Sequence, residues 1–360
     1  MDALPPRLTP EEEGSFQYLR IKDQTPPILT KAIDALHRHK SEFFEKHGEE
    51  GTEAEKKAIS LLSKLRNELQ TDKPFLPLTD NSADTDVWNQ YLEYHHSLLN
   101  ENNKKIVLWG NKCDLALSPD ESIPETSSPV VTLEDLQLFI LVDNMDHVWS
   151  LLINRKKMRQ ETFPVTRVDF IMDNAGFELV ADLVMADFLL ASKLATEIHF
   201  HGKSIPWFVS NTIKKDMDWV IEQLKAANTK CMSDCGINWE HYLKHTWIYQ
   251  DHMFWTLPHE YCTMSQVSPD LYAELQKSNL ILFKGDLNYR KLVGDRKWKL
   301  TVPFHQALNG FHPAPLCSIR TVKTEALVGL AHGQGRHVAG IDPQWRTSGK
   351  FGVFQFDGSL

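Results

Sequence analysis

Polar side chains follow several apolar runs of this chain, at the position where each run ends. Asp173 and Asn174 come directly after the run 167–172, and Asn211 comes directly after the run 204–210. Because ligands bind at the carboxyl ends of parallel strands, these side chains are expected to meet at one edge of a sheet. Their carboxylate and amide oxygens suit Mg²⁺ or Mn²⁺ better than zinc, which prefers histidine and cysteine. The spacing therefore predicts a site for a hard divalent ion.

Two later apolar runs are followed by positive charge. Lys284 and Asp286 follow the run 280–283, and Arg320 and Lys323 follow the run that ends near Ile319. Lysine supplies the counter-charge that phosphate needs, and a metal ion beside it would polarise a phosphoryl group and activate water. One strand-end Asp alone is more often a helix cap or a turn residue. Four strand ends together predict hydrolysis of a phosphate ester, with Asp286 as the candidate general base.

Alternating strand and helix patterns frame these residues. Short segments with strand-like composition predict strands over 167–172, 197–202, 204–210, 280–283 and 315–323, and alternation of apolar and polar residues predicts another over 349–356. Longer stretches with helical spacing of apolar residues predict helices over 177–195, 216–228 and 268–279. This alternation indicates an α/β fold, a three-layer α/β/α domain with a parallel-rich sheet.

The first hundred residues have a different, helical pattern. Apolar residues recur at helical spacing over 28–48 and 53–70, and Gly48 is a stop signal between the two stretches. A stretch rich in Pro, Ser and acidic residues, 118–128, reads as a linker. We therefore expect an N-terminal helical region over 1–128 and the α/β/α domain over 129–360.

Composition limits the partners and the compartment. The chain has 360 residues, a net charge of -9 and a pI of about 6.0, which disfavours nucleic acid and anionic membranes as partners. Five cysteines without disulfide-framework spacing favour a reducing, intracellular setting. We expect the cytoplasm, with the nucleus left open.

Three other motifs suggest chemistry but lack the context it needs. GNKCDL at 110–115 imitates the guanine-specifying NKxD of GTPases, yet no GxxxxGK[ST] phosphate loop exists in the sequence. The glycine-rich stretch 329–340 follows no strand that ends in an acidic residue. His241 and His245 have the spacing of helical metal ligands without an HExxH motif. We read none of them as the site.

Four longer segments carry a family resemblance: MDNAGFELVADL, HGKSIPWFVS, LILFKGDLNYRKLVGDRKW and IRTVK. They resemble the motifs of the metal-dependent damage-control phosphatases, and the RTxK pattern at 320–323 is similar to the sugar-phosphate branch of that family. The resemblance runs through most of 15–100 and nearly all of 105–360. It implies a helical domain before an α/β/α domain. It also implies hydrolysis of small phosphorylated sugars, such as fructose 1-phosphate and fructose 6-phosphate, stimulated by Mn²⁺ or Ni²⁺, with Mg²⁺ or Co²⁺ as further candidates.

The resemblance also implies roles for individual residues. Asp173, Asn174 and position 211 match the metal ligands of the family, and Asp173 and Asp286 would be catalytic. The substrate contacts of the family match Glu178, Asp286, Leu287, Asn288, Tyr289, Arg290 and Lys323. With the strand-end residues Asp173, Asn174 and Lys284, they make up the expected substrate site. Position 211 departs from the family, which has Asp where this chain has Asn211. Because an amide lacks the negative charge of a carboxylate, we expect weaker metal binding.

A second departure concerns length. The chain passes from SLLNENNKK at 97–105 directly to IVLWGNKCDL at 106–115, where the family has several more helices and a Tyr-Arg-Arg stretch. The helical domain is therefore expected to be shortened, which raises the alternative of a non-catalytic protein that only binds metabolite. Another alternative is transfer of a methyl group from S-adenosylmethionine to protein glutamate, with Glu178 as a cofactor contact. The sequence favours the phosphatase, because it has many cations and no class I methyl-donor loop.

Overall fold

The structure, a computed structural model, describes residues 4–9, 18, 21–22, 25–70, 139–159, 165–208 and 210–359. The chain forms two compact units, one of residues 8–109 and the other of residues 110–360 together with 1–7. The predicted boundary at residue 128, the 110–115 motif and the junction at residue 105 lie outside the described residues.

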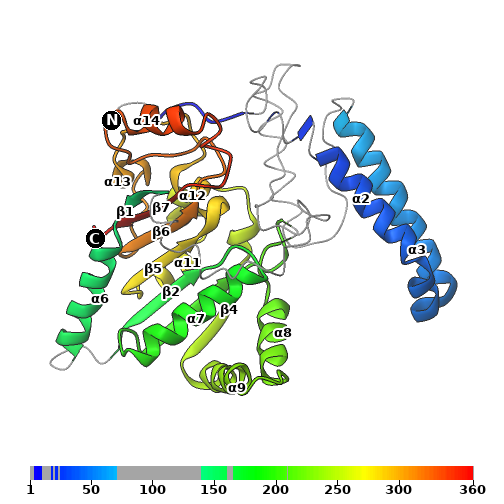
Figure 1. The fold of residues 1–360 in the computed structure, drawn as a ribbon, viewed down its shortest axis with the longest axis horizontal. Coiled ribbons are helices and arrows are strands. Elements are labelled where there is room, and N and C mark those ends of the chain that lie inside the picture. Colours follow the sequence, from blue (N-terminus) through cyan, green and yellow to red (C-terminus); the bar gives the residue numbers. More distant parts are fainter. Residues whose placement is uncertain are drawn as a thin grey trace. The chain divides into compact units, whose positions relative to one another are not determined.

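The helical unit contains α2 (Thr25–Arg38) and α3 (Lys40–Gln70), which pack side by side as a hairpin (Figure 1). α3 is interrupted at Gly48, whose positive φ of 60° breaks the helix where the sequence predicts a stop. The chain also breaks at His39, so the stretch predicted as one helix over 28–48 is divided. Arg66 Nη1 donates to Thr30 Oγ1 at 3.1 Å, which ties the end of α3 to α2.

Seven strands in the described part of the larger unit form one sheet in the order β1-β7-β6-β5-β2-β3-β4. Their bounds are β1 (Ile140–Asp143), β2 (Arg167–Ile171), β3 (Glu197–Gly202), β4 (Trp247–Asp251), β5 (Leu280–Lys284), β6 (Leu316–Thr321) and β7 (Gly352–Asp357). β2 to β6 run parallel to one another, whereas β7 is antiparallel to β6 and β1 is parallel to β7. The carboxyl ends of β2, β3 and β5 therefore lie at one edge.

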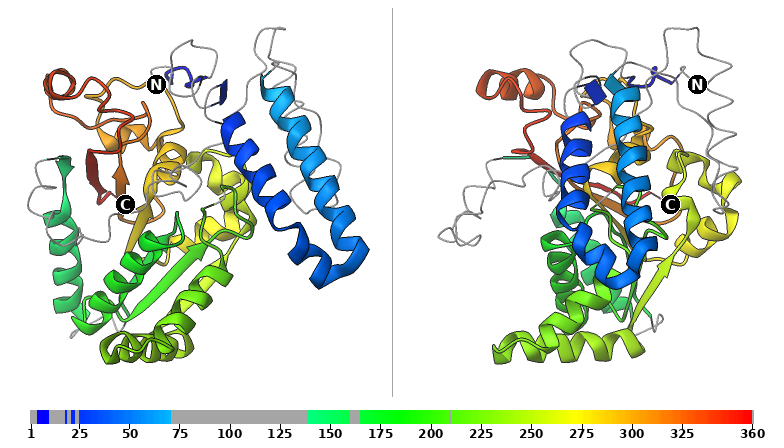
Figure 2. Two further views of the ribbon diagram at one scale, coloured as in Figure 1. Left: turned by 45° about the vertical axis from the view of Figure 1, so that its right-hand side comes forward. Right: turned by 90° about the vertical axis from the view of Figure 1, so that its right-hand side faces the viewer.

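Helices cover both faces of this sheet (Figure 2). Alternate strand residues, such as Val168 and Phe170, pack against one layer, formed by α6 (Met145–Arg159), α7 (Phe177–Ala191), α8 (Lys214–Lys225) and α9 (Lys230–His245). On the opposite face, the Phe283 ring lies 5.5 Å from Tyr261 and 5.9 Å from Phe311. That layer includes η2 (Met253–Thr256), η3 (Tyr261–Thr263), α10 (Met264–Val267), α11 (Pro269–Leu275) and α12 (Gly285–Val293). The predicted α/β/α architecture is confirmed.

Two short helices lie near the end of the sheet that carries β1 and β7. α13 (Phe304–Ala307) contacts β7, and Gln334, the first residue of α14 (Gln334–Ile341), donates to the Leu141 carbonyl of β1 at 2.7 Å. No helix among the described residues is long and apolar enough to cross a membrane.

The strand predicted over 204–210 is wrong. Its described residues form bends and a turn, and residue 211 makes only an isolated bridge to Asn174. Pro206 has no N–H to donate to a ladder, and β3 already pairs with β4 on that side. Conversely, β1, β4 and α9 are not among the predicted elements. The described residues of 204–210 therefore form a loop, and residue 211 lies at the carboxyl ends of the strands.

Candidate functional site

The site is built where β2 and β5 end side by side. Ile171 pairs with Phe283, so Asp173 and Gly285 follow neighbouring strand ends. Gly285 has a φ of 79°, and a Cβ at this position would lie 1.8 Å from Asp173 Oδ2. Only glycine fits, because both the backbone conformation and the space exclude a side chain. The start of α12 is thereby held against the Asp173 carboxylate.

The three predicted metal positions come together. Asp173, Asn174 and Asn211 are each 2% exposed. Asn211 Nδ2 donates to Asp173 Oδ1 at 3.2 Å, and the Thr212 amide donates to the Asp173 carbonyl at 2.9 Å. The loop 204–210 and the end of β2 therefore meet at Asp173.

The orientation of the two amides decides how well these positions fit a metal ion. Asn211 Oδ1 accepts from the Phe208 amide at 2.8 Å, so its nitrogen rather than its oxygen faces Asp173. Asn174 Oδ1 accepts from Ser210 Oγ at 2.9 Å and retains a second lone pair. Asn174 Nδ2 donates to Glu178 Oε2 at 2.8 Å and to Asp173 Oδ2 at 3.4 Å, so the nitrogen of this amide also faces Asp173. The residue types fit a hard divalent cation, and the Asp173 carboxylate already faces the site. The amides of Asn174 and Asn211 must both rotate before their oxygens can bind a cation beside Asp173.

The Asp173 carboxylate sits in a mixed electrostatic environment. Burial raises its pKa well above the ordinary value, and Glu178 and Asp286 raise it further. Lys203 and Lys323 oppose this rise in the pKa, so positive charge from two other segments acts on Asp173. A buried carboxylate of this kind is stabilised by a cation bound next to it.

Lys284, at the end of β5, reaches two carboxylates on α7. Its Nζ lies 2.8 Å from Asp182 Oδ1 and 3.8 Å from Glu178 Oε1. Burial alone would lower the pKa of Lys284, but the two carboxylates outweigh it and the pKa is raised. Burial also raises the pKa of Asp182 to about 6, although Lys284 opposes the rise. Sequence patterns did not single out Asp182, but its position one helical turn after Glu178 is a usable signal.

Asp286 is held by Arg320, the first residue of the RTxK segment, and by Thr324, which follows that segment. Arg320 Nε donates to Asp286 Oδ1 at 2.8 Å, and Thr324 Oγ1 donates to the same oxygen at 3.2 Å. The Arg320 guanidinium lies over the Tyr289 ring at 4.1 Å from its centroid and also donates to Thr324 Oγ1 at 2.8 Å. These contacts fix Asp286 at the start of α12, within electrostatic range of Asp173.

The side chains of Leu287 and Asn288 contribute to the folded core. Leu287 is buried, and Asn288 is fully buried. Asn288 Nδ2 donates to the Lys284 carbonyl at 2.7 Å and to the Ile171 carbonyl at 3.2 Å, while its Oδ1 accepts from Tyr261 OH at 2.5 Å. Asn288 therefore fastens α12 to the end of β2.

Tyr289 and Arg290 are likewise engaged within α12 and its surroundings. Tyr289 OH accepts from the Val328 amide at 3.2 Å, and Arg290 Nε donates to Asp295 Oδ1 at 2.9 Å. The substrate contacts expected of 287–290 stay a prediction, because these side chains have structural partners of their own.

Two further lysines, not singled out from the sequence, lie close to this edge. Lys203, directly after β3, is buried, and its Nζ donates to the Met172 carbonyl at 3.1 Å. Burial lowers its pKa to about 8, opposed by Asp173. Lys291 Nζ donates to the Leu257 carbonyl at 2.6 Å and lies 4.6 Å from the centre of the Trp207 ring. Lys203 could have been found by the strand-end rule, because it follows β3 as Asp173 follows β2.

Comparison with known proteins gives one consistent family. The family described as damage-control phosphatase ARMT1-like domain matches residues 79–338. The damage-control phosphatase ARMT1 of Homo sapiens is 53% identical over 442 aligned positions, covering 100% of both chains. The protein of that name from Bos taurus is 53% identical over 438 positions, with 99% of each chain covered. The one from Danio rerio is 47% identical over 435 positions, with 98% of this chain and 97% of the relative covered.

The alignment lengths bear on the expected shortening. The 442 aligned positions exceed the 360 residues of this chain by 82. The human relative therefore has about 82 residues without a counterpart here. That these positions belong to helices of the N-terminal region stays a prediction.

Proposed function

Because the chain belongs to the ARMT1-like damage-control phosphatase family, a family of hydrolases, we propose that it hydrolyses phosphate esters of small sugars with the help of a divalent metal ion. Fructose 1-phosphate and fructose 6-phosphate are the proposed substrates. The observation that carries this proposal is the meeting of Asp173, Asn174 and Asn211 within reach of buried lysines.

The proposed metal is Mn²⁺ or Ni²⁺, with Mg²⁺ and Co²⁺ as alternatives. Asp173 would bind it through its carboxylate, and Asn174 and Asn211 would bind it through their side-chain oxygens after rotation of both amides. When bound, the ion would polarise a phosphoryl oxygen and lower the pKa of a water molecule. Because only Asp173 among the three carries negative charge, we expect metal affinity lower than that of a site with Asp at position 211.

The remaining residues bind the phosphate and move the proton. Because Lys203 and Lys323 both lie close enough to act on the Asp173 carboxylate, we propose that these two lysines neutralise the phosphate. Asp286 would accept the proton of the attacking water, and Arg320 would keep its carboxylate in place. Arg320 is thus a positioning residue in this scheme.

We propose a reducing intracellular compartment for this activity, the cytoplasm, with the nucleus still open. Cys231, Cys235, Cys262 and Cys317, the cysteines in the described part of the chain, are free. The net charge of -9 gives no reason to add nucleic acid or membranes to the small phosphorylated sugar as partners.

Release of inorganic phosphate from fructose 1-phosphate in the presence of Mn²⁺ tests the proposal. We expect activity in the wild type and a loss of about a hundredfold or more in Asp286→Asn, because a general base contributes at least that much. Asp218→Asn is the matched control, since Asp218 is half exposed on α8 and pairs with Lys214. Wild-type activity that survives Asp286→Asn unchanged would contradict the assignment of the general base.

The same purified proteins also test the two alternatives, a methyltransferase and a non-catalytic protein that binds metabolite. Methyl transfer from labelled S-adenosylmethionine to protein carboxylates, without phosphate release, would replace the phosphatase proposal by the methyltransferase. Binding of sugar phosphate without turnover would replace it by the non-catalytic protein.

A further inference from the structure

A second group of ligand-type side chains lies away from Asp173. Asp357, the last residue of β7, pairs in register with Leu316, the first residue of β6. Because β6 runs parallel to β5 and β2, Asp357 lies at the amino ends of these strands. Asp173 follows the carboxyl end of β2, so the two carboxylates lie at opposite edges of the sheet.

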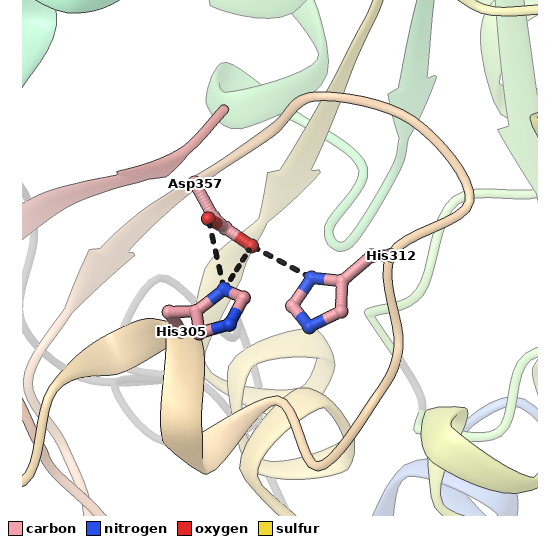
Figure 3. A group of neighbouring side chains, drawn as sticks. All are labelled: His305, His312 and Asp357. Atoms are coloured by element: carbon pink, nitrogen blue, oxygen red, sulfur yellow. Dashed lines mark hydrogen bonds and ion pairs between the residues drawn. The ribbon is translucent and has the colours of Figure 1, made fainter. Parts of the chain in front are cut away.

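Two histidines converge on Asp357 from a different segment (Figure 3). His305 lies in α13, and His312 lies in the loop that follows it. His305 Nδ1 is 3.2 Å from both carboxylate oxygens, and His312 Nδ1 is 2.7 Å from Asp357 Oδ2. In the part of the chain that the structure describes, this is the one group of three or more His, Cys, Asp or Glu side chains whose ligand atoms lie within 4.8 Å of one another.

The two histidine–carboxylate separations are close to the spacing of neighbouring ligand atoms around a metal ion. The two imidazole rings stack with their centres 4.4 Å apart and their planes 17° from parallel, so at least one ring must turn for both Nδ1 atoms to bind the same ion. Metal–nitrogen and metal–oxygen bonds of about 2.0–2.2 Å place neighbouring ligand atoms roughly 3 Å apart. His312 Nδ1 is buried and makes no aligned hydrogen bond to any described residue, although it lies 2.7 Å from the carboxylate oxygen. The pair of atoms is thus close without the direction that an N–H···O bond requires.

Further contacts give the group the support that a metal site needs. Asp357 is 6% exposed, and its Oδ1 accepts from Ser359 Oγ at 2.8 Å, which orients the carboxylate. The His305 side chain is 57% exposed and that of His312 is 18% exposed. Solvent can therefore reach the group from the side of His305 and supply a remaining ligand.

We propose that His305, His312 and Asp357 bind a borderline divalent transition-metal ion of the Zn²⁺, Co²⁺ or Ni²⁺ class, at a site separate from the Asp173 site. Two imidazoles and one carboxylate favour these ions over Mg²⁺ and Mn²⁺. The ion links α13 and the following loop to the last strand of the sheet, so its role is to stabilise the C-terminal part of the domain.

Co²⁺ titration of the metal-stripped, full-length protein tests this proposal. The titration is run on Asp173→Asn, which removes the other carboxylate ligand, and is followed by visible absorption and by the midpoint of thermal unfolding. We expect saturable binding of one Co²⁺, a d–d band without thiolate charge transfer, and a higher unfolding midpoint. Adding His305→Ala or His312→Ala should weaken Co²⁺ binding by at least about tenfold.

His241→Ala is the matched control. The His241 and His245 rings lie 4.5 Å apart on α9, a second pair of neighbouring histidines that is not part of the proposed site. Because His305 is largely exposed, its variant is expected to fold, and the metal-free thermal melt checks this. Absence of saturable binding in Asp173→Asn, binding unchanged by both His305→Ala and His312→Ala, or loss caused by His241→Ala would overturn the proposal.

Discussion

Replacing Asn211 with aspartate is expected to make the stability of the protein depend on a divalent metal. The two side chains have the same shape, so aspartate can keep the contact with the Phe208 amide. Its second oxygen then takes the place of the nitrogen that donates to Asp173 Oδ1 at 3.2 Å. A hydrogen bond is thereby replaced by two carboxylates in contact.

The loss of folding stability that Asn211→Asp causes in the absence of metal has an upper limit. Two unit charges 3.2 Å apart repel by about 5 kcal/mol at an effective dielectric constant of about 20. Protonation of one carboxylate at pH 7 limits the cost to about 4 kcal/mol, since each pKa unit is worth about 1.4 kcal/mol. Burial already raises the pKa of Asp173, so part of this cost exists in the wild type. The lost hydrogen bond alone is worth about 1 kcal/mol, which gives an expected destabilisation of about 1–4 kcal/mol.

Metal should reverse this effect. At a Mn²⁺ concentration about 100 times the dissociation constant, binding stabilises the folded state by about 2.7 kcal/mol. The assay is denaturant unfolding of wild type, Asn211→Asp and Asn211→Ala, each with a chelator and with Mn²⁺. Asn211→Ala loses the hydrogen bonds without adding charge, so its response to Mn²⁺ should be no larger than that of the wild type. Our reasoning about position 211 fails if Mn²⁺ stabilises Asn211→Asp no more than Asn211→Ala, or if Mn²⁺-dependent phosphate release does not rise.

Three other changes probe the same edge of the sheet. Gly285→Ala should lower the free energy of unfolding, measured with denaturant, by several kcal/mol, because its Cβ would collide with Asp173. Gly310→Ala should lower it by only about 1 kcal/mol, because Gly310 has a φ of 86° but nothing within 4 Å of a Cβ. Equal losses in the two variants would contradict the close approach of Gly285 to Asp173. Arg320→Lys should lower kcat about tenfold or more with a smaller change in KM, because lysine lacks the planar guanidinium that holds the general base Asp286. An unchanged kcat would exclude a positioning role for Arg320. Burial raises the pKa of Asp182 to about 6, so the folded protein keeps a proton that the unfolded chain releases near pH 4. Stability should therefore fall by about 3 kcal/mol as the pH rises from about 4 to 6, and urea unfolding of Asp182→Asn should show a smaller fall.

The central strands, and the polar residues that follow their carboxyl ends, could be predicted from the sequence because these strands are regularly buried. β2, β3, β5 and β6 each coincide with a segment predicted as a strand. α7 lies within the long stretch over 177–195 in which apolar residues recur at helical spacing. The strand-end rule then placed Asp173 and Asp286 at one edge without any knowledge of strand order. Parallel connections make this possible, since every parallel strand ends on the same side.

Other features depend on contacts between distant segments and have no local signal. The loop 204–210 has the apolar composition of a strand, and only the pairing of β3 with β4 excludes it from the sheet. The direction of the Asn211 amide is set by Phe208, which no pattern of residue types specifies. The convergence of His305 with Asp357 joins residues 52 positions apart and follows from the antiparallel path of β7.

The most direct test of the enzyme assignment is the position of bound metal. Crystals of the wild-type protein soaked with Mn²⁺ and a phosphate analogue, and measured by anomalous diffraction, should show Mn²⁺ bound to side-chain oxygens of Asp173 and Asn174, with the oxyanion beside Lys323. Mn²⁺ found only at other side chains, or an oxyanion bound far from Asp173, would contradict the assignment.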